Sequence, residues 1–196
     1  MGRQRRRWAV ARCAESCVDK KMPAVASITF RKLSVDDLRM LHHWLARPHV
    51  AEWWQPVPTW QEVVADFMPM TDATATTRGY IALLNDAPLG FIQSYVVMGS
   101  GEGWWEDETD PGARGIDQFL ADGSQLGCGL GNAMIRAFVD MLFLDAAVTK
   151  VQADPSPDNT RAIRCYLRAG FATFGEVVTP DGFAMLMICE RSDSAL

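Results

Sequence analysis

Three alternating glycines, placed between a β-rich run and a long helical run, constrain the fold of this chain more than any other feature. Residues 125–131 are Gln-Leu-Gly-Cys-Gly-Leu-Gly, and apolar residues with helical spacing follow over 132–144. Glycine allows a tight turn, so successive N–H groups surround one point at the positive end of the following helix. Such a loop binds a pyrophosphate, but a plain glycine turn before a helix has the same pattern. The neighbouring elements have to decide between the two.

Strand and helix signals alternate around this glycine loop. Helices are predicted after the N-caps Ser34 and Thr59, over 132–144, and from Asn159 to Arg168. The order is β-α-α-β-β-β-α-β-α-β-β. An antiparallel front half that meets a βαβ unit predicts an α/β (α+β) fold with a mixed sheet of about six to seven strands and helices on both faces. The predicted strands cover residues 28–31, 80–84, 89–98, 115–121, 148–153, 171–178 and 184–189.

Composition excludes several classes of protein. The 196 residues suit a single domain, and 48% hydrophobic with 22% charged residues is typical of a globular protein. No apolar run approaches the roughly 20 residues that span a bilayer, so we expect no membrane partner. The five cysteines are scattered, and Cys13 and Cys17 lack a second pair for zinc. The adjacent His42 and His43 cannot share a helical face, so we expect no metal.

Charge is divided unevenly along the chain. Residues 1–24 hold seven Lys/Arg and two Asp/Glu, which leaves 12 basic and 22 acidic residues and a net charge of −10 over 25–196. We expect 1–24 to be a basic, disordered extension and 25–196 to be one domain; an RNA- or membrane-binding arm is the alternative. An acidic body argues against nucleic acid and fits a cationic partner, although solubility alone would also explain it.

The combination of a strand, a glycine loop, a helix, a strand, and then Asn159 opening a helix that contains Tyr166 resembles the GCN5-related N-acetyltransferase (GNAT) superfamily. Longer blocks, in the same order, resemble the aminoglycoside 6′-N-acetyltransferases, and the likeness covers roughly residues 27–190. It implies the GNAT fold, acetyl-CoA as co-substrate, no metal, and a cytoplasmic bacterial enzyme, monomer or homodimer, that inactivates aminoglycosides. The blocks are 52–54, 99–105, 108–112, 114–118, 154–157 and 161–166.

The resemblance also implies which residues hold acetyl-CoA. Leu126 departs from the Arg or Gln that the superfamily has before the first loop glycine, and Cys128 stands where many relatives have a basic residue. Neither change removes a backbone amide, so we expect a working loop with weaker affinity for CoA. Asn159 could equally be only a helix cap. The residues assigned to acetyl-CoA are Gln118, Leu120, Gln125, Leu126, Gly127, Gly129, Leu130, Gly131, Asn159 and Tyr166.

The implied reaction is direct attack of an amine on a thioester, which requires a carboxylate to accept the amine's proton, directly or through water. Asp117 matches the family's acidic residue beside the 6′-amine. The residues beside Asp117 show no clean alternation, so it could instead be a solvent-facing strand position. Tyr166 lies two helical turns after Asn159, on the same face. In the family this Tyr points at the CoA sulfur and protonates the thiolate; a packed core aromatic is the alternative.

A substrate with several ammonium groups needs carboxylates and aromatic faces. The resemblance assigns this role to Glu102, Trp104, Trp105, Asp117, Asp154 and Asp181. The loop 99–115 is long, which favours function, but an acidic loop can be merely solvated, paired tryptophans can be core, and Asp-Gly is common turn chemistry. The carboxylates of segment 102–122 are Glu102, Glu106, Asp107, Glu108, Asp110, Asp117 and Asp122.

Two other functions stay open at this stage. One is acetylation of another small polyamine or of a protein amine. The other is a non-catalytic acyl-CoA-binding module, against which the presence of both Asp117 and Tyr166 argues.

Overall fold

A computed structural model describes residues 27–101 and 103–191. The predictions for the basic extension and for Glu102 therefore lie outside the described residues. Seven strands form one sheet in the order β1-β2-β3-β4-β5-β7-β6, and only the β4–β5 pair is parallel. The predicted mixed sheet is confirmed. Its strands are β1 (Ile28–Lys32), β2 (Thr77–Leu84), β3 (Ala87–Val96), β4 (Ala113–Leu120), β5 (Lys150–Ala153), β6 (Ala172–Thr179) and β7 (Gly182–Glu190).

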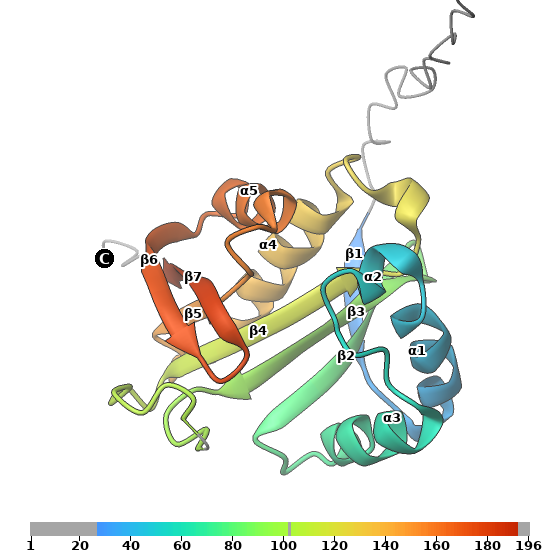
Figure 1. Ribbon diagram of the computed structural model, residues 1–196, viewed down its shortest axis with the longest axis horizontal. Coiled ribbons are helices and arrows are strands. Elements are labelled where there is room, and N and C mark those ends of the chain that lie inside the picture. The colour runs from blue at the N-terminus through green and yellow to red at the C-terminus, as the bar shows by residue number, and fades with distance from the viewer. Residues whose placement is uncertain (1–26, 102, 192–196) are drawn as a thin grey trace, which may run out of the picture.

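Helices cover both faces of the sheet, as predicted (Figure 1). The helices α1 (Leu38–Leu45), α2 (Pro48–Ala51) and α3 (Trp60–Phe67) lie on one face. The helices α4 (Leu130–Leu142) and α5 (Thr160–Arg168) lie on the other. Short 3₁₀ turns η1 (Val35–Asp37), η2 (Pro69–Thr71) and η3 (Gly123–Gln125) complete the elements.

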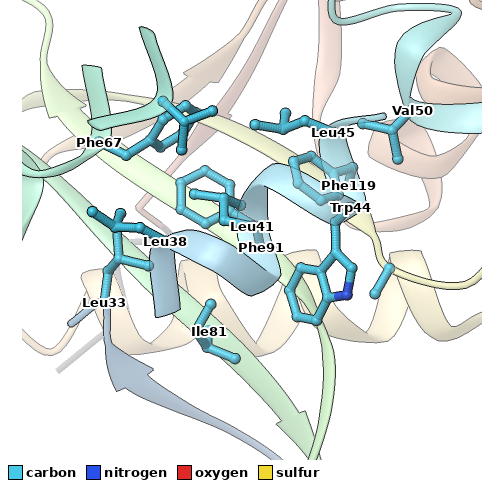
Figure 2. Packing of buried hydrophobic residues seen from close by; sticks show 12 residues of the cluster. Leu33, Leu38, Leu41, Trp44, Leu45, Val50, Phe67, Ile81, Phe91 and Phe119 are labelled. Atoms are coloured by element: carbon cyan, nitrogen blue, oxygen red, sulfur yellow. The ribbon is translucent and has the colours of Figure 1, made fainter. Parts of the chain in front are cut away.

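Because β3 and β4 are buried on both faces, they have no clean apolar alternation. On the α1 face, Phe91 and Phe119 pack together at 5.7 Å between ring centroids and lie next to α1 (Figure 2). On the α4 face, Ile92 and Ile116 pack against Phe138. These central strands therefore carry apolar residues on both faces. The face toward which a side chain points has to be read from the strand register, because the pattern of polar residues does not show it.

Several predicted boundaries differ from the structure, and prolines lie at two of them. The turn between β2 and β3 contains only Asn85 and Asp86, which have φ angles of 50° and 65°, so Ala87 and Pro88 belong to β3. A two-residue turn with both φ positive matches the twist of a hairpin, and a register shift between Ala82 and Leu83 accommodates the proline. The first helix does end before Pro48, but Pro48 then begins α2, since its fixed φ suits the first position of a helix.

The two parallel strands β4 and β5 separate part of the way along the sheet. Their pairing covers only Ala113–Gly115 against Lys150–Gln152, whereas β4 continues to Leu120. Beyond this point the β5-facing edge of β4 has no strand partner. The sheet is therefore open at its centre, and the chain after β5 passes over this opening into α5.

Candidate active site

A cavity of about 1080 Å³ lies at this central opening. Every described residue that the sequence assigns to the acceptor or to catalysis lines it, although these residues come from five separate segments. No lysine or arginine of the described ranges lines it. The predicted residues brought together are Trp104, Trp105, Asp117, Asp154, Tyr166 and Asp181.

Asp117 points to the cavity because of the register between β3 and β4. It pairs directly with Gln93, and the Gln93 amide donates a hydrogen bond of 2.8 Å from Nε2 to Asp117 Oδ2. Loss of solvation raises the pKa of Asp117, Asp181 raises it further, and the Gln93 hydrogen bond opposes both. The predicted alternative, a solvent-facing strand position, is wrong.

Asp154 and Asp181 complete a group of three carboxylates. Asp154 follows β5, and desolvation together with the charges of Asp117 and Asp181 raises its pKa to about 7. Asp181 occupies the turn between β6 and β7. Three acidic groups that line one cavity, with no lysine or arginine of the described chain at its wall, form a site for a ligand that carries several positive charges.

Two tyrosines border the carboxylates. Tyr166 is 5% exposed and its ring lies 5.1 Å from that of Phe171, so it is a packed core aromatic and also part of the cavity wall. Tyr95 lies over Gly115, where an added Cβ would meet the Tyr95 ring at 2.0 Å. Burial raises the pKa of both phenols well above the usual value, and Asp117 and Asp154 add to this. Both therefore stay protonated at neutral pH.

Part of the acidic loop does not face the ligand cavity. Trp104 and Trp105 do, with centroids 6.1 Å apart, and Trp105 has φ of 50°, which is uncommon outside glycine. Glu108, however, pairs with Lys150 at 2.7 Å, and Asp110 accepts hydrogen bonds from Gly112 N and Thr149 Oγ1.

Three more carboxylates of the same segment also miss the cavity wall. Glu106 and Asp107 are exposed away from it, and Asp122 accepts from Ser124 N. The prediction that the segment 102–122 supplies the acceptor carboxylates is wrong for these five residues, because local hydrogen bonds, an ion pair and solvent satisfy them. Among the described ones only Asp117 contributes.

A second groove of about 330 Å³ adjoins the cavity on the side of the glycine loop. Trp53, Trp54, Gln118, Asn159 and Ala162 line both spaces, so the two meet. The predicted cofactor residues found in the groove are Gln118, Leu120, Leu126, Gly127, Gly129, Gly131 and Asn159.

The glycine loop has the geometry of an anion cradle. Gly127 and Gly129 have φ of 76° and 83°, and a Cβ on either would find no atom within 4 Å, so the loop faces open space. Gly129 is the N-cap of α4, whose first N–H groups have no partner within the helix. Gly131 has a different role, since a Cβ there would lie 3.2 Å from Cys165 Sγ; it allows α4 and α5 to approach.

Three predicted cofactor residues do not line the groove. The Leu130 side chain is buried with Ala82, Leu89 and Met134, and Gln125 sits in η3. Tyr166 lines the acceptor cavity rather than the groove. The position of Asn159 is compatible with both of its predicted roles. Its Oδ1 accepts a hydrogen bond of 3.0 Å from Ala162 N as a helix cap, and the residue lines both spaces.

Several residues at the site were not predicted. Gln93 and Tyr95 carry no motif, and only the β3–β4 register brings them to Asp117 and Gly115. Three arginines of α5 also border the groove, and their spacing in the helix was the available signal. They are Arg161, Arg164 and Arg168, and His49 lines the groove as well.

Together the two spaces fit a two-substrate transfer. The groove offers free backbone N–H groups, cations and open glycine backbone, which suit a phosphate-bearing ligand such as CoA. The cavity offers carboxylates and indoles, which suit a polyamine. In the described ranges no helix could cross a membrane and no group of three or more His, Cys, Asp or Glu could hold a metal.

Several known proteins that are similar to this chain are acetyltransferases. Residues 34–179 match the family model of the acetyltransferase (GNAT) domain. The aminoglycoside N(6′)-acetyltransferase type 1 of Klebsiella pneumoniae is 53% identical over 168 residues, 84% of each chain. A kanamycin resistance protein of Rhizobium radiobacter is 62% identical over 88 residues, 45% of this chain and 82% of that protein. A crystal structure of aminoglycoside acetyltransferase AAC(6′)-Ib with coenzyme A and kanamycin superposes with a TM-score of 0.80 at 54% identity, over 84% of this chain and 95% of that one.

Proposed function

The chain belongs to the aminoglycoside 6′-N-acetyltransferases of the GNAT superfamily, and we propose that it transfers the acetyl group of acetyl-CoA to the 6′-amine of aminoglycoside antibiotics. The observation that carries this proposal is the cluster of Asp117, Asp154 and Asp181, with no lining Lys or Arg among the described residues, at the junction with an anion-binding groove. An aminoglycoside carries several ammonium groups on sugar rings, and three carboxylates at different positions of one wall would select it.

Binding and orientation come first in the proposed reaction. Asp154 and Asp181 hold ammonium groups by charge-assisted hydrogen bonds, and Trp104 and Trp105 offer flat faces to the sugar rings. Acetyl-CoA, when bound, supplies the activated acetyl group. The N–H groups of the glycine loop and α4, with Arg161 and Arg164 at the rim, suit its phosphates.

Proton transfer then falls to two residues. Asp117 Oδ1 has no hydrogen-bond partner among the described residues and accepts the proton of the attacking amine, directly or through water. The raised pKa of Asp117 makes it a stronger base than an ordinary aspartate. Tyr166 retains its proton at neutral pH and can give it to the departing thiolate.

The product explains resistance. Acetylation removes one positive charge from the antibiotic and adds bulk, which weakens its electrostatic hold on ribosomal RNA phosphates. We expect the enzyme to act in the bacterial cytoplasm, where its co-substrate and the ribosome are found.

A free-thiol assay with acetyl-CoA and kanamycin tests the function directly. We expect one thiol released per antibiotic acetylated, with the new acetyl group on the 6′-nitrogen by NMR. Thiol release with spermidine but not with kanamycin would favour the alternative amine substrate. Acetyl-CoA binding by calorimetry without thiol release for any amine would favour a non-catalytic module.

A further inference from the structure

Gln93 contacts the proposed base but carries no motif and matches no assigned site. Its amide nitrogen lies 2.8 Å from Asp117 Oδ2, and the two residues face each other across neighbouring strands. Its other amide atom, Oε1, is buried and has no hydrogen-bond partner. A buried amide with one satisfied end and one unsatisfied end is unusual, because the unmade hydrogen bond costs free energy.

A carboxylate as crowded as Asp117 needs a specific partner to stay ionised. Tyr95 from β3, Asp154 after β5, Tyr166 from α5 and Asp181 from the β6–β7 turn surround it. None of these is a cation, and each of the four is negatively charged when ionised. Within the described chain the Gln93 N–H is the hydrogen-bond donor that Asp117 has.

We propose that Gln93 is a positioning residue for Asp117, which holds Oδ2 of the ionised carboxylate and so presents Oδ1 to the substrate amine. The Gln93 amide can also form a hydrogen bond to Asp117 after this carboxylate has accepted the proton. The proton arrives at Oδ1, so Oδ2 becomes the carbonyl oxygen of the neutral acid and keeps its hydrogen bond from Gln93 Nε2. One side chain could therefore satisfy both protonation states of the base. This inference rests on the proposed function, since it requires Asp117 to act as base.

Replacement by an apolar residue of similar size tests the proposal. Gln93→Leu removes the donor, so the ionised carboxylate loses its partner and the acid limb of the kcat–pH profile should move up by about one pH unit. On that limb kcat should fall roughly tenfold, while kcat on the alkaline plateau and the KM for acetyl-CoA change little. The matched control is Gln61→Leu, the same substitution at an exposed position of α3 outside both spaces, and it should leave the profile unchanged.

Titration of Asp117 in the absence of substrates provides a second measurement. The Asp117 carboxyl carbon, identified by its loss in Asp117→Asn, should titrate about one pH unit higher in Gln93→Leu than in the unmodified protein when followed by NMR. An unchanged midpoint in both measurements would overturn the positioning role, whatever happens to kcat. Absence of thiol release by the unmodified protein, in contrast, would count against the proposed function and leave the NMR result to judge Gln93.

Discussion

At the scale of single residues, a conservative substitution should remove the proton acceptor at Asp117 and the proton donor at Tyr166. Asp117→Asn keeps the shape but cannot accept a proton, so kcat for thiol release should fall about 10²-fold or more. Tyr166→Phe keeps the packing against Phe171 and loses only the hydroxyl, so kcat should fall while calorimetric affinity for kanamycin stays the same. An Asp117→Asn enzyme with undiminished kcat would dismiss the base, and an affinity loss without a kcat loss in Tyr166→Phe would indicate packing instead.

In the absence of substrate, ionisation of Asp154 should lower the free energy of unfolding. Its folded-state pKa of about 7 lies above the ordinary value of 3.8, so the folded protein binds this proton more tightly than the unfolded chain does. The penalty is absent below pH 4, grows as the pH rises from 4 to 7, and is complete above 7. Asp154→Asn should therefore raise the melting temperature at pH 8 by about 2–4 °C for each kcal/mol relieved. The gain should shrink toward pH 5, and an equal gain at pH 5 and 8 would contradict it.

The resemblance assigned Asp117, Asp154 and Asp181 to the acceptor, and all three line the cavity. Glu108 and Asp110 belong to the same acidic segment as Asp117 but do not line it. The difference lies in their partners: Glu108 pairs with Lys150 at the start of β5, and Thr149, just before β5, donates a hydrogen bond to Asp110. Gln93 and Tyr95 were missed for the same reason, because contacts across strands depend on a register that polarity patterns did not fix.

At the scale of elements, β3 and β4 fit together because Gly115 of β4 leaves room for the Tyr95 ring of β3. An added Cβ would lie 2.0 Å from the Tyr95 ring, so Gly115→Ala must displace the ring from the cavity wall. We expect a loss of about 1–3 kcal/mol in the free energy of unfolding, together with reduced kcat. In a Tyr95→Ala background the same change should cost almost nothing, because the clash is gone. Equal costs in the two backgrounds, measured by urea unfolding, would refute the contact.

The start of α5 combines a structural and a binding role in Asn159. Asn159→Ala should lose about 1 kcal/mol of stability with the cap to Ala162 N. Asn159→Asp keeps an acceptor for the cap, but it loses the amide donor and brings a negative charge to the groove. Its melting temperature should therefore match the unmodified protein, while the KM for acetyl-CoA rises several-fold. An unchanged KM would leave Asn159 as a cap alone.

Element types were predictable because their local signals are strong. Ser34, Thr59 and Asn159 each precede a helix, as the capping pattern predicts. The boundaries shifted where two signals competed. Pro48 ends one helix and begins the next, and Pro88 is accommodated within β3 at a bulge instead of ending the strand.

At the scale of the whole molecule, the opening between β4 and β5 creates the site, and this opening depends on how all seven strands associate. The strand order places β7 between β5 and β6, so the C-terminal hairpin carries Asp181 to the same cavity as Asp117. The βαβ unit could be predicted from the sequence. The distance along which β4 and β5 stay paired could not, because no local pattern marks where pairing stops.

The charge of the molecule should also influence how fast the substrate arrives. Residues 25–196 carry a net charge of −10, and five carboxylates line the cavity: Glu62, Asp66, Asp117, Asp154 and Asp181. A polycation is therefore attracted over a distance comparable to the Debye length, about 30 Å at 0.01 M and 8 Å at 0.15 M salt. Raising KCl from 20 to 500 mM should lower kcat/KM for kanamycin by roughly tenfold. Below saturation kcat/KM reports capture, whereas kcat at saturating kanamycin reports later steps and should change little.

A monoamine acceptor provides the control for this salt dependence, because with one charge it should lose much less than the polycation. The contribution of the carboxylates that line the cavity can then be distinguished from that of the rest of the acidic surface. Asp181→Asn removes one charge at the cavity, whereas Asp107→Asn removes one from an exposed position outside it. If the cavity focuses the field, the first variant should flatten the salt dependence more than the second. Equal effects would assign the attraction to net charge, and no salt dependence at all would show that capture is not electrostatic.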